Sequence, residues 1–223
     1  MRSIGLKFGS FCSLAVGILY ILVGATHLFL PRGQLRGAGA FTLYESLARN
    51  STIFSVHYWI VVVLSILSIG VMISLYELLR DYRSEMVSWA IVLGLFGAGL
   101  SLLDYAYVGV EAPRFARLFV SASDEIRSAM ANTGLQHIDP CFLSWGLLGI
   151  FAVTINASLL HFRLVKPLLG FLGLIGGVFY FLLFIGALFH VSLLIDLSAV
   201  FGGIVLAPIW YIWIGFVLSA GKQ

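Results

Sequence analysis

Apolar residues dominate the chain in six long segments, which short polar stretches and two longer loops separate. A helix needs about 20 apolar residues to cross the hydrocarbon core of a membrane. These segments are apolar all round, without the alternation of a barrel strand, and backbone groups in lipid must bond internally, so helices are favoured. We predict spans at about residues 9–30, 52–79, 86–110, 140–162, 167–189 and 197–218.

The composition agrees with this pattern. Hydrophobic residues make up 61% of the chain and charged residues 10%, whereas a soluble domain carries about 25% charged residues. We therefore predict an all-α polytopic membrane protein, in which residues 1–223 form a single transmembrane domain of six helices in one bundle. The formal net charge of +3 is scattered over loops without a basic run, which argues against nucleic-acid binding.

The loop after the third predicted span has an amphipathic pattern of its own. Apolar residues recur at helical spacing between Phe115 and Met130, with charged residues at other positions. Pro113 suits the first turn of a helix and Gly134 suits its end. We predict a short amphipathic surface helix here, which either lies along the membrane or packs on the bundle as an ordinary loop helix.

Lysine and arginine residues predict the orientation, because they gather in the cytoplasmic loops of membrane proteins. With six spans both termini lie on one side of the membrane. That side carries its basic residues in short segments: Arg2, Lys7, Arg80, Arg83, Arg163, Lys166 and Lys222. The other side spreads Arg32, Arg36, Arg49, Arg114, Arg117 and Arg127 over two long loops. The greater density on the first side predicts that both termini are cytoplasmic.

Ionisable side chains inside the predicted spans are candidate site residues, because such groups are costly in lipid. Most of them lie toward the end of the bundle that this topology assigns to the outside. Each helix contributes to this layer, whose candidate residues for an ion or ligand cavity are His27, His57, Asp104, Glu111, His190 and Asp196. Asp104 lies well inside its apolar segment, and we expect its partner to be His57 or His190.

Several kinds of chemistry fit such a layer. Imidazole and carboxylate groups bind zinc, iron or manganese, so His57, Asp104 and His190 are candidate ligands of a transition metal. Two histidines on different helices are also able to hold a haem. The same groups suit a proton relay or a polar headgroup. A simpler interpretation is that they only reach interfacial water and hydrogen-bond the loops.

Three functional hypotheses follow. The first is a ligand- or ion-binding protein with a cavity lined by histidines and carboxylates in its outer half. The second is a metal-dependent membrane enzyme, either a hydrolase or an oxidoreductase. The third is an accessory subunit whose helices pack on a partner in a larger membrane complex. The chain contains no GxxxxGK[ST], HExxH or GxSxG motif, so the common nucleotide, metalloprotease and serine-hydrolase signatures are absent.

Three apolar motifs resemble the DUF4386-like family of small six-helix bacterial membrane proteins. They are Leu-Tyr-Ile-Leu at residues 19–22, Leu-Tyr-Glu-Leu-Leu-Arg at residues 75–80 and Trp-Tyr-Ile-Trp-Ile-Gly at residues 210–215. The resemblance spans most of the chain and implies a bacterial inner-membrane location, but no activity or functional residues. A more distant resemblance, through His57 and Asp104, is to seven-helix membrane hydrolases that hold zinc; this chain has no HxxxH pair in its last helix.

Overall fold

The computed structural model describes residues 2–34, 39–82 and 84–220. Within them, six helical segments are long and apolar enough to cross a membrane, which confirms the predicted all-α polytopic fold. Five are the single helices α1 (Arg2–Phe29), α3 (Thr52–Leu78), α4 (Glu85–Ser121), α6 (Leu143–His161) and α7 (Pro167–Leu188), and the sixth runs from α8 (Ser192–Ser198) through a π-helical segment, η2 (Ala199–Leu206), to α9 (Ala207–Ala220). Arg36, Arg83 and Lys222, which the predicted orientation uses, lie outside the described residues.

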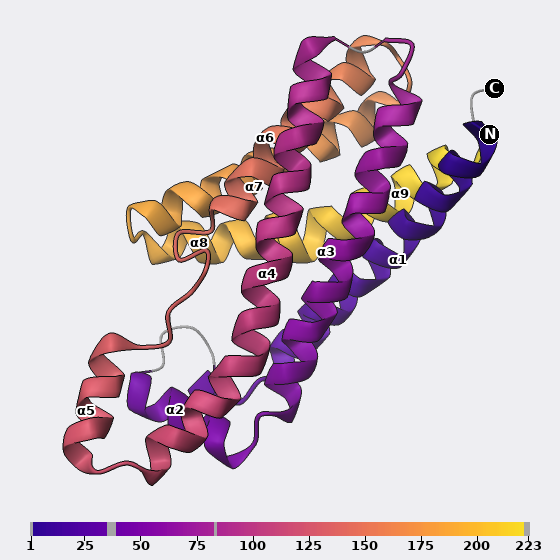
Figure 1. Cartoon of the computed structure of the whole chain (residues 1–223). Coiled ribbons are helices and arrows are strands. Elements are labelled where there is room, and N and C mark those ends of the chain that lie inside the picture. Colours follow the sequence, from indigo (N-terminus) through magenta and orange to yellow (C-terminus); the bar gives the residue numbers. More distant parts are fainter. Residues whose placement is uncertain (1, 35–38, 83, 221–223) are drawn as a thin grey trace.

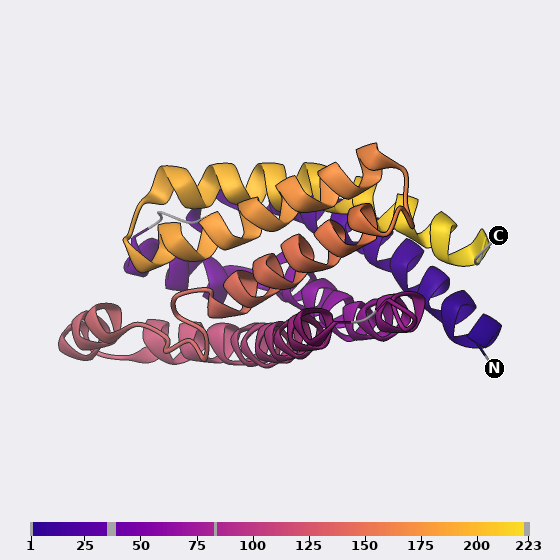
Figure 2. The ribbon, with the colours of Figure 1, turned by 90° about the horizontal axis from the view of Figure 1, so that it is seen from above.

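The six spans form a closed ring in chain order. Each span packs on the next, and α9 closes the ring by packing along α1. Figure 1 shows α1 and α9 side by side near the two termini, after which they diverge, so that the opposite ends of the spans are splayed. Seen from above, α3 and α4 lie on one side of the bundle and α8 to α9 on the other (Figure 2). The termini, the α3–α4 turn and the α6–α7 turn lie at the same end.

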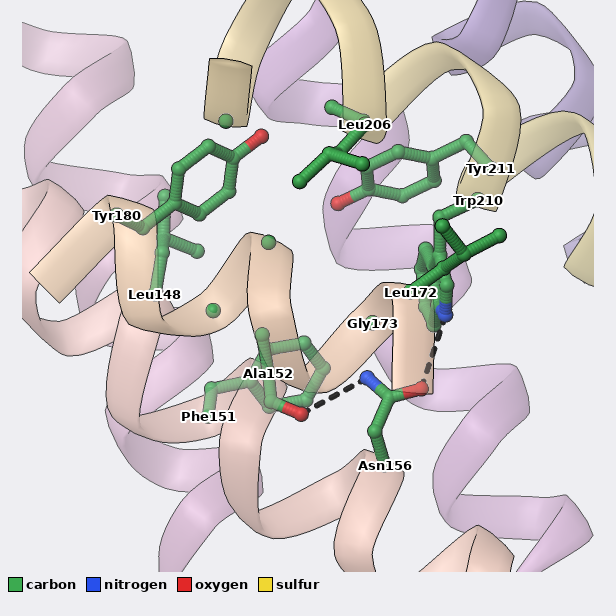
Figure 3. Close-up of a pocket in the computed structure, with 14 residues that line it drawn as sticks. Leu148, Phe151, Ala152, Asn156, Leu172, Gly173, Tyr180, Leu206, Trp210 and Tyr211 are labelled. Atoms are coloured by element: carbon green, nitrogen blue, oxygen red, sulfur yellow. Dashed lines mark hydrogen bonds between the residues drawn. The ribbon is translucent and has the colours of Figure 1, made fainter. Parts of the chain in front are cut away.

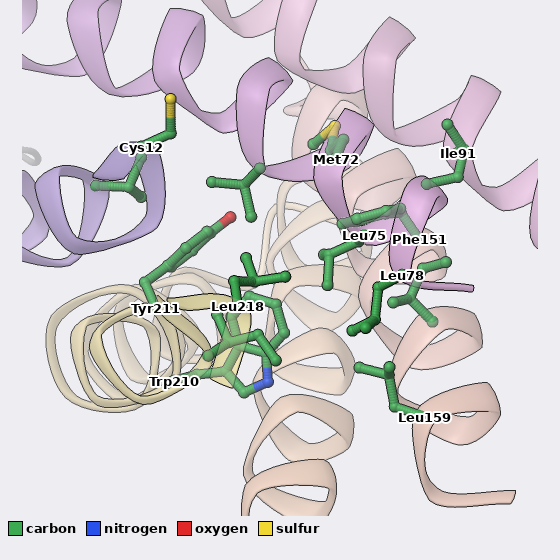
Figure 4. Close-up of a cluster of buried hydrophobic side chains, with 14 of the residues drawn as sticks. Cys12, Met72, Leu75, Leu78, Ile91, Phe151, Leu159, Trp210, Tyr211 and Leu218 are labelled. Atoms are coloured by element: carbon green, nitrogen blue, oxygen red, sulfur yellow. The ribbon is translucent and has the colours of Figure 1, made fainter. Parts of the chain in front are cut away.

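The solid part of the bundle lies at this terminal end. Its buried apolar side chains come from all six spans, among them Val16, Leu75, Ile91, Ile155 and Ile214. Figure 4 shows this cluster, in which side chains from α3, α4, α6 and α9 meet. Buried apolar residues fill this end, and the polar residues of the cavity described below lie at the other.

Glycines allow α6 and α7 to pack closely. A Cβ atom added to Gly149 would lie 2.6 Å from the backbone nitrogen of Phe181 and 2.8 Å from the carbonyl oxygen of Gly177. Small residues at helix interfaces permit such approach, which is the main source of helix association in lipid. The α6–α7 interface is therefore a contact between backbones.

The sixth span changes its hydrogen-bonding register just before Pro208. Proline has no N–H group, so it cannot bond to the carbonyl group one turn earlier. The preceding residues, Ala199–Leu206, form a π-helix. π-Helical turns widen a helix and are frequent at functional sites; this one faces the splayed end of the ring.

Two features of the loops at the splayed end differ from the prediction. The span predicted at residues 86–110 continues without a break through Pro113 to Ser121, so the first half of the predicted surface helix belongs to α4. A separate short helix, α5 (Asp124–Thr133), does lie in the third loop and ends at Gly134, as predicted. The first long loop contains a helix that was not predicted, α2 (Ala40–Arg49).

These helices form a small cap beyond the splayed end (Figure 1). Tyr44 and Leu47 of α2 pack on Ala116 and Phe119 of α4, which explains why α4 stays helical beyond its apolar segment. Arg127 of α5 donates a hydrogen bond to Glu45 and lies 4.8 Å over the Phe119 ring. At the start of α5, hydrogen bonds from its own backbone N–H and from Ser123 lower the pKa of the Glu125 carboxyl.

Candidate functional site

A cavity of about 420 Å³ lies inside the splayed end of the ring. This volume is within the range of small-molecule sites, roughly 300–1,000 Å³. All six spans contribute to its wall, which is mainly apolar and aromatic with a few polar groups. Its lining residues are Tyr20, Val23, His27, His57, Tyr105, Phe142, Trp145, Tyr180, Leu183, Ile195, Asp196, Ala199, Val200, Gly203 and Ile204.

The cavity brings together three of the six predicted site residues. His27 of α1 and His57 of α3 have ring centroids 6.1 Å apart, and Asp196 of α8 lines the same space. His27 and Asp196 are exposed, whereas His57 is half-buried. The two exposed side chains therefore mark the opening of the cavity, and His57 lies farther in.

The hydrogen bonds around His57 favour one tautomer of its ring. Nδ1 of His57 lies 2.9 Å from Oγ1 of Thr26, and the Thr26 hydroxyl already donates to the carbonyl oxygen of Leu22 at 2.8 Å. A hydroxyl has one hydrogen to donate, so while the Thr26 hydroxyl donates to Leu22, the bond between Thr26 and His57 takes its hydrogen from Nδ1. Nε2 of the neutral ring is then a hydrogen-bond acceptor, and none of the described residues donates to it.

Two tyrosine hydroxyls face each other at the inner end of the cavity. The Tyr180 hydroxyl donates to the Tyr20 hydroxyl at 2.8 Å, and Trp145 packs edge-on against the Tyr180 ring at 5.0 Å between centroids. Tyr20 and His27 are seven residues apart and share one face of α1, which gives the cavity a length of about 10 Å along that helix. Aromatic side chains thus surround a space with polar groups at both ends.

Asp104 is buried at a different place, and its partner is not the one predicted. Its Oδ1 accepts hydrogen bonds from the backbone N–H groups of Ile138 at 2.7 Å and Asp139 at 3.1 Å, and its Oδ2 lies 3.3 Å from Nδ1 of His137. The expectation of a pair with His57 or His190 was wrong. Asp104 holds the loop before α6 against the side of α4.

Asp139 continues this anchor into α6. Its carboxylate accepts hydrogen bonds from the backbone N–H groups of Leu143 at 2.6 Å and Ser144 at 2.8 Å. Negative groups stabilise the first turn of a helix, whose N–H groups otherwise lack partners. Asp104 and Asp139 therefore position Phe142 and Trp145, which line the cavity, without lining it themselves.

Glu111 and His190 also lie outside the cavity lining. Glu111 pairs with Arg114 at 3.5 Å, one turn later on α4. His190 is exposed in the turn between α7 and α8, where its φ of 57° is left-handed. Both residues were predicted as cavity residues because they lie near helix ends, but one forms a surface ion pair and the other forms a turn.

The predicted metal ligands are dispersed. Among the residues that the structure describes, no three His, Cys, Asp or Glu side chains are grouped so that they could hold a metal ion. His57 contacts Thr26 and His27, Asp104 contacts the loop before α6, and His190 lies in its turn. The arrangement therefore lends no support to a metal at His57, Asp104 and His190.

A second, smaller pocket of about 40 Å³ lies deeper, between α6, α7 and α9. Figure 3 shows its polar group, Asn156, whose amide donates to the carbonyl oxygen of Ala152 at 2.8 Å and accepts from Nε1 of Trp210 at 2.9 Å. Tyr180 lines both this pocket and the large cavity. Because its polar groups are already paired, the small pocket offers no free group to a ligand.

The aromatic wall of the cavity was missed at the sequence level. Tyr20, Tyr105, Trp145 and Tyr180 were not among the predicted site residues. One signal was available: Tyr20, Val23 and His27 recur at a spacing that aligns them on one helical face. No comparable signal in the sequence joins them to Tyr180, because that contact depends on how the ring of helices closes.

Comparison with known proteins gives no further guidance: no family model, curated protein or solved structure matches the chain. The resemblance to the DUF4386-like family therefore stays a prediction. The geometry of the cavity is the observation from which a function can be argued.

Proposed function

We propose that this integral membrane protein binds a small ligand in the cavity between His27, His57 and Tyr180. The observation that carries the proposal is the contrast between the two ends of the ring. Apolar side chains fill the terminal end, whereas the splayed end keeps a space of about 420 Å³ with a few polar groups on its wall. Packed protein interiors hold few voids larger than a water molecule, so a space of this size is a candidate site.

The wall has the composition of a binding site for an organic molecule rather than for a bare ion. Its aromatic side chains supply contact area, and a few placed polar groups, such as the acceptor Nε2 of His57, supply orientation. An ion would need several oxygen or nitrogen ligands at one point. The cavity instead spreads its polar groups over a length of about 10 Å.

We also propose that the protein lies in a bacterial inner membrane with both termini in the cytoplasm. Lys7 lies near the start of α1, Arg80 beside the α3–α4 turn, and Arg163 and Lys166 in the α6–α7 turn, all at the terminal end of the bundle (Figure 1). Basic residues in short loops favour the cytoplasmic side. The cavity then opens toward the outer half of the membrane.

Gly203 provides the variant that tests this function. It lines the cavity, and a Cβ added to it would meet no atom within 4 Å, so the cavity wall has room for a larger side chain at this position. Gly99 of α4 has the same open surroundings and does not line the cavity, so Gly99→Leu is the matched control. Native mass spectrometry of protein released from membranes, with extraction and identification of the bound molecules, compares the three proteins.

We expect wild type and Gly99→Leu to carry the same small molecule, and Gly203→Leu to lack it. If Gly203→Leu folds and retains that molecule at the wild-type level, the cavity is not the binding site. If all three proteins carry only annular lipid in equal amounts, the proposed function is contradicted.

A further inference from the structure

We infer that the cavity takes a membrane-soluble ring alcohol, a phenol or quinol, which enters sideways from the bilayer between α1 and the α8–η2 segment. This inference rests on the proposed function and specifies its ligand. Three separate observations carry it: the side on which the cavity opens, the aromatic wall, and the contact of His57 Nδ1 with Thr26.

The exposed residues of the cavity wall lie on α1 and on the α8–η2 segment. Tyr180 and Leu183 of α7 form a buried back wall, while Ala199 and Val200 of η2 line the cavity and are exposed, as is His27 across from them. Val200 is 44% exposed on a membrane-spanning segment, so this opening faces lipid.

Divergence of the two helices explains the opening. A Cβ added to Gly24 of α1 would lie 3.1 Å from Ile204, which shows that α1 and η2 touch at that depth. Nearer the ends they separate, as Figure 1 shows for α1 and the α8 end of the sixth span. A ligand dissolved in the bilayer therefore reaches the cavity without passing through the cap formed by α2 and α5.

The wall around the cavity favours a ring. Tyr105, Trp145 and Tyr180 come from three different helices, and aromatic pairs add stabilisation beyond that of buried area. A flexible acyl chain gains no such geometry-dependent contact. A flat ring is accordingly better suited than an acyl chain to this space.

The tautomer of His57 selects a hydroxyl group. Because Nδ1–H donates to Thr26, Nε2 can only accept a hydrogen bond while the ring is neutral. A ligand hydroxyl donates to it, whereas an ether or carbonyl oxygen at the same position faces a lone pair. The site should therefore prefer a phenol over its methyl ether, although the two have almost the same shape and solubility in lipid.

The test measures binding of 4-octylphenol and 4-octylanisole to the full-length protein in lipid nanodiscs by titration calorimetry. We expect the phenol to bind roughly three- to tenfold more tightly, the range for one hydrogen bond. His57→Phe should bring the two affinities to within a factor of about two. Equal affinities for wild type, or an unchanged preference in His57→Phe, would overturn the choice of an alcohol.

Lateral access is tested with a second pair of variants. Val200→Trp places a large side chain at the opening. The control is Val178→Trp on α7, because Val178 is similarly exposed, at 48%, but does not line the cavity. The association rate of 4-octylphenol should fall at least about fivefold in Val200→Trp and stay unchanged in Val178→Trp. An unchanged rate in Val200→Trp would overturn lateral access.

The two levels of the proposal fail in different ways. If protein from native membranes carries a small molecule that Gly203→Leu loses, but wild type does not bind 4-octylphenol, the cavity is a binding site and the ring-alcohol class is wrong. If 4-octylphenol binds equally well to wild type and Gly203→Leu, it binds elsewhere, and the ring-alcohol inference is contradicted whatever the proteins carry from native membranes.

Discussion

The buried carboxylate of Asp104 accepts a hydrogen bond from the backbone N–H of Ile138 at 2.7 Å, which joins the middle of α4 to the loop before α6. The same oxygen accepts from the Asp139 N–H, and Asp139 in turn caps α6. A residue that looks like a ligand in the sequence is therefore part of an anchor. The anchor sets where α6 begins and thereby positions one wall of the cavity.

Asp104→Ala should destabilise the protein by about 2–3 kcal/mol, because two buried N–H groups lose a charged acceptor. His137→Ala removes a partly exposed partner and should cost less than about 1 kcal/mol. Thermal or denaturant unfolding in detergent measures both variants, and hydrogen exchange at Ile138 and Asp139 reports on the anchor itself. Wild-type stability together with slow exchange in Asp104→Ala would show that the carboxylate is not the anchor.

Asn156 and Trp210 should show a measurable pairwise coupling in the membrane interior. A double-mutant cycle with Asn156→Leu and Trp210→Phe isolates the 2.9 Å hydrogen bond between them. We expect a coupling of roughly 0.6–1.7 kcal/mol, the range for interhelical hydrogen bonds in lipid. Additive effects of the two substitutions on unfolding would mean that the bond contributes nothing to stability.

The close packing of α6 on α7 predicts a strong effect of a single methyl group. Gly149→Ala should destabilise the protein by roughly 1–3 kcal/mol, because the new Cβ meets backbone atoms of α7 that cannot move aside. Gly99→Ala adds the same atom in open surroundings and should be neutral or slightly stabilising. Equal unfolding temperatures for the two variants would argue against the backbone contact.

These positions also show how far the sequence could predict the structure. For most ends of the six spans, the predicted boundary lies within a few residues of the observed one. A continuous apolar segment of membrane length has few alternative structures, so its position is readily predicted. α4 was cut short at residue 110, since hydropathy detects the end of a membrane segment and not the end of a helix. Pro113 looked like a helix start, but the α2 side chains that stabilise α4 beyond it come from another loop.

The site was only half predicted, for a related reason. His27, His57 and Asp196 do line one cavity, because they occupy corresponding depths on helices that become neighbours. The depth of a residue in the membrane, which is all that the sequence gives, could not distinguish these three residues from Asp104, Glu111 and His190. Those residues form hydrogen bonds, an ion pair and a turn, which depend on loop conformation and on which helical face points inward.

Thr26 should control the ligand preference without touching the ligand. Thr26→Val keeps the shape of the side chain but removes the oxygen to which Nδ1–H of His57 donates. The proton is then free to move to Nε2, so the preference for 4-octylphenol over 4-octylanisole should fall toward one. The measurement is the ratio of the dissociation constants of 4-octylanisole and 4-octylphenol for Thr26→Val. A ratio equal to that of wild type would mean that another group sets the tautomer of His57.

The proposed orientation predicts which positions a membrane-impermeant maleimide can label in intact cells. In a Cys141→Ser background, Ser123→Cys in the cap should react, and Lys166→Cys in the α6–α7 turn should react only after lysis, because both positions are exposed at opposite ends of the bundle. The reverse pattern would place the termini outside and the cavity toward the cytoplasm.

The most direct test of the central claim is photolabelling with an alkylphenol that carries a diazirine, followed by peptide mapping of the labelled protein in lipid. We predict that labelling falls on residues 20–27 and 195–204, that 4-octylphenol competes with it, and that Gly203→Leu abolishes it. Labelling confined to lipid-exposed positions such as Val178, unaffected by the competitor, would contradict a ligand site inside the splayed end of the bundle.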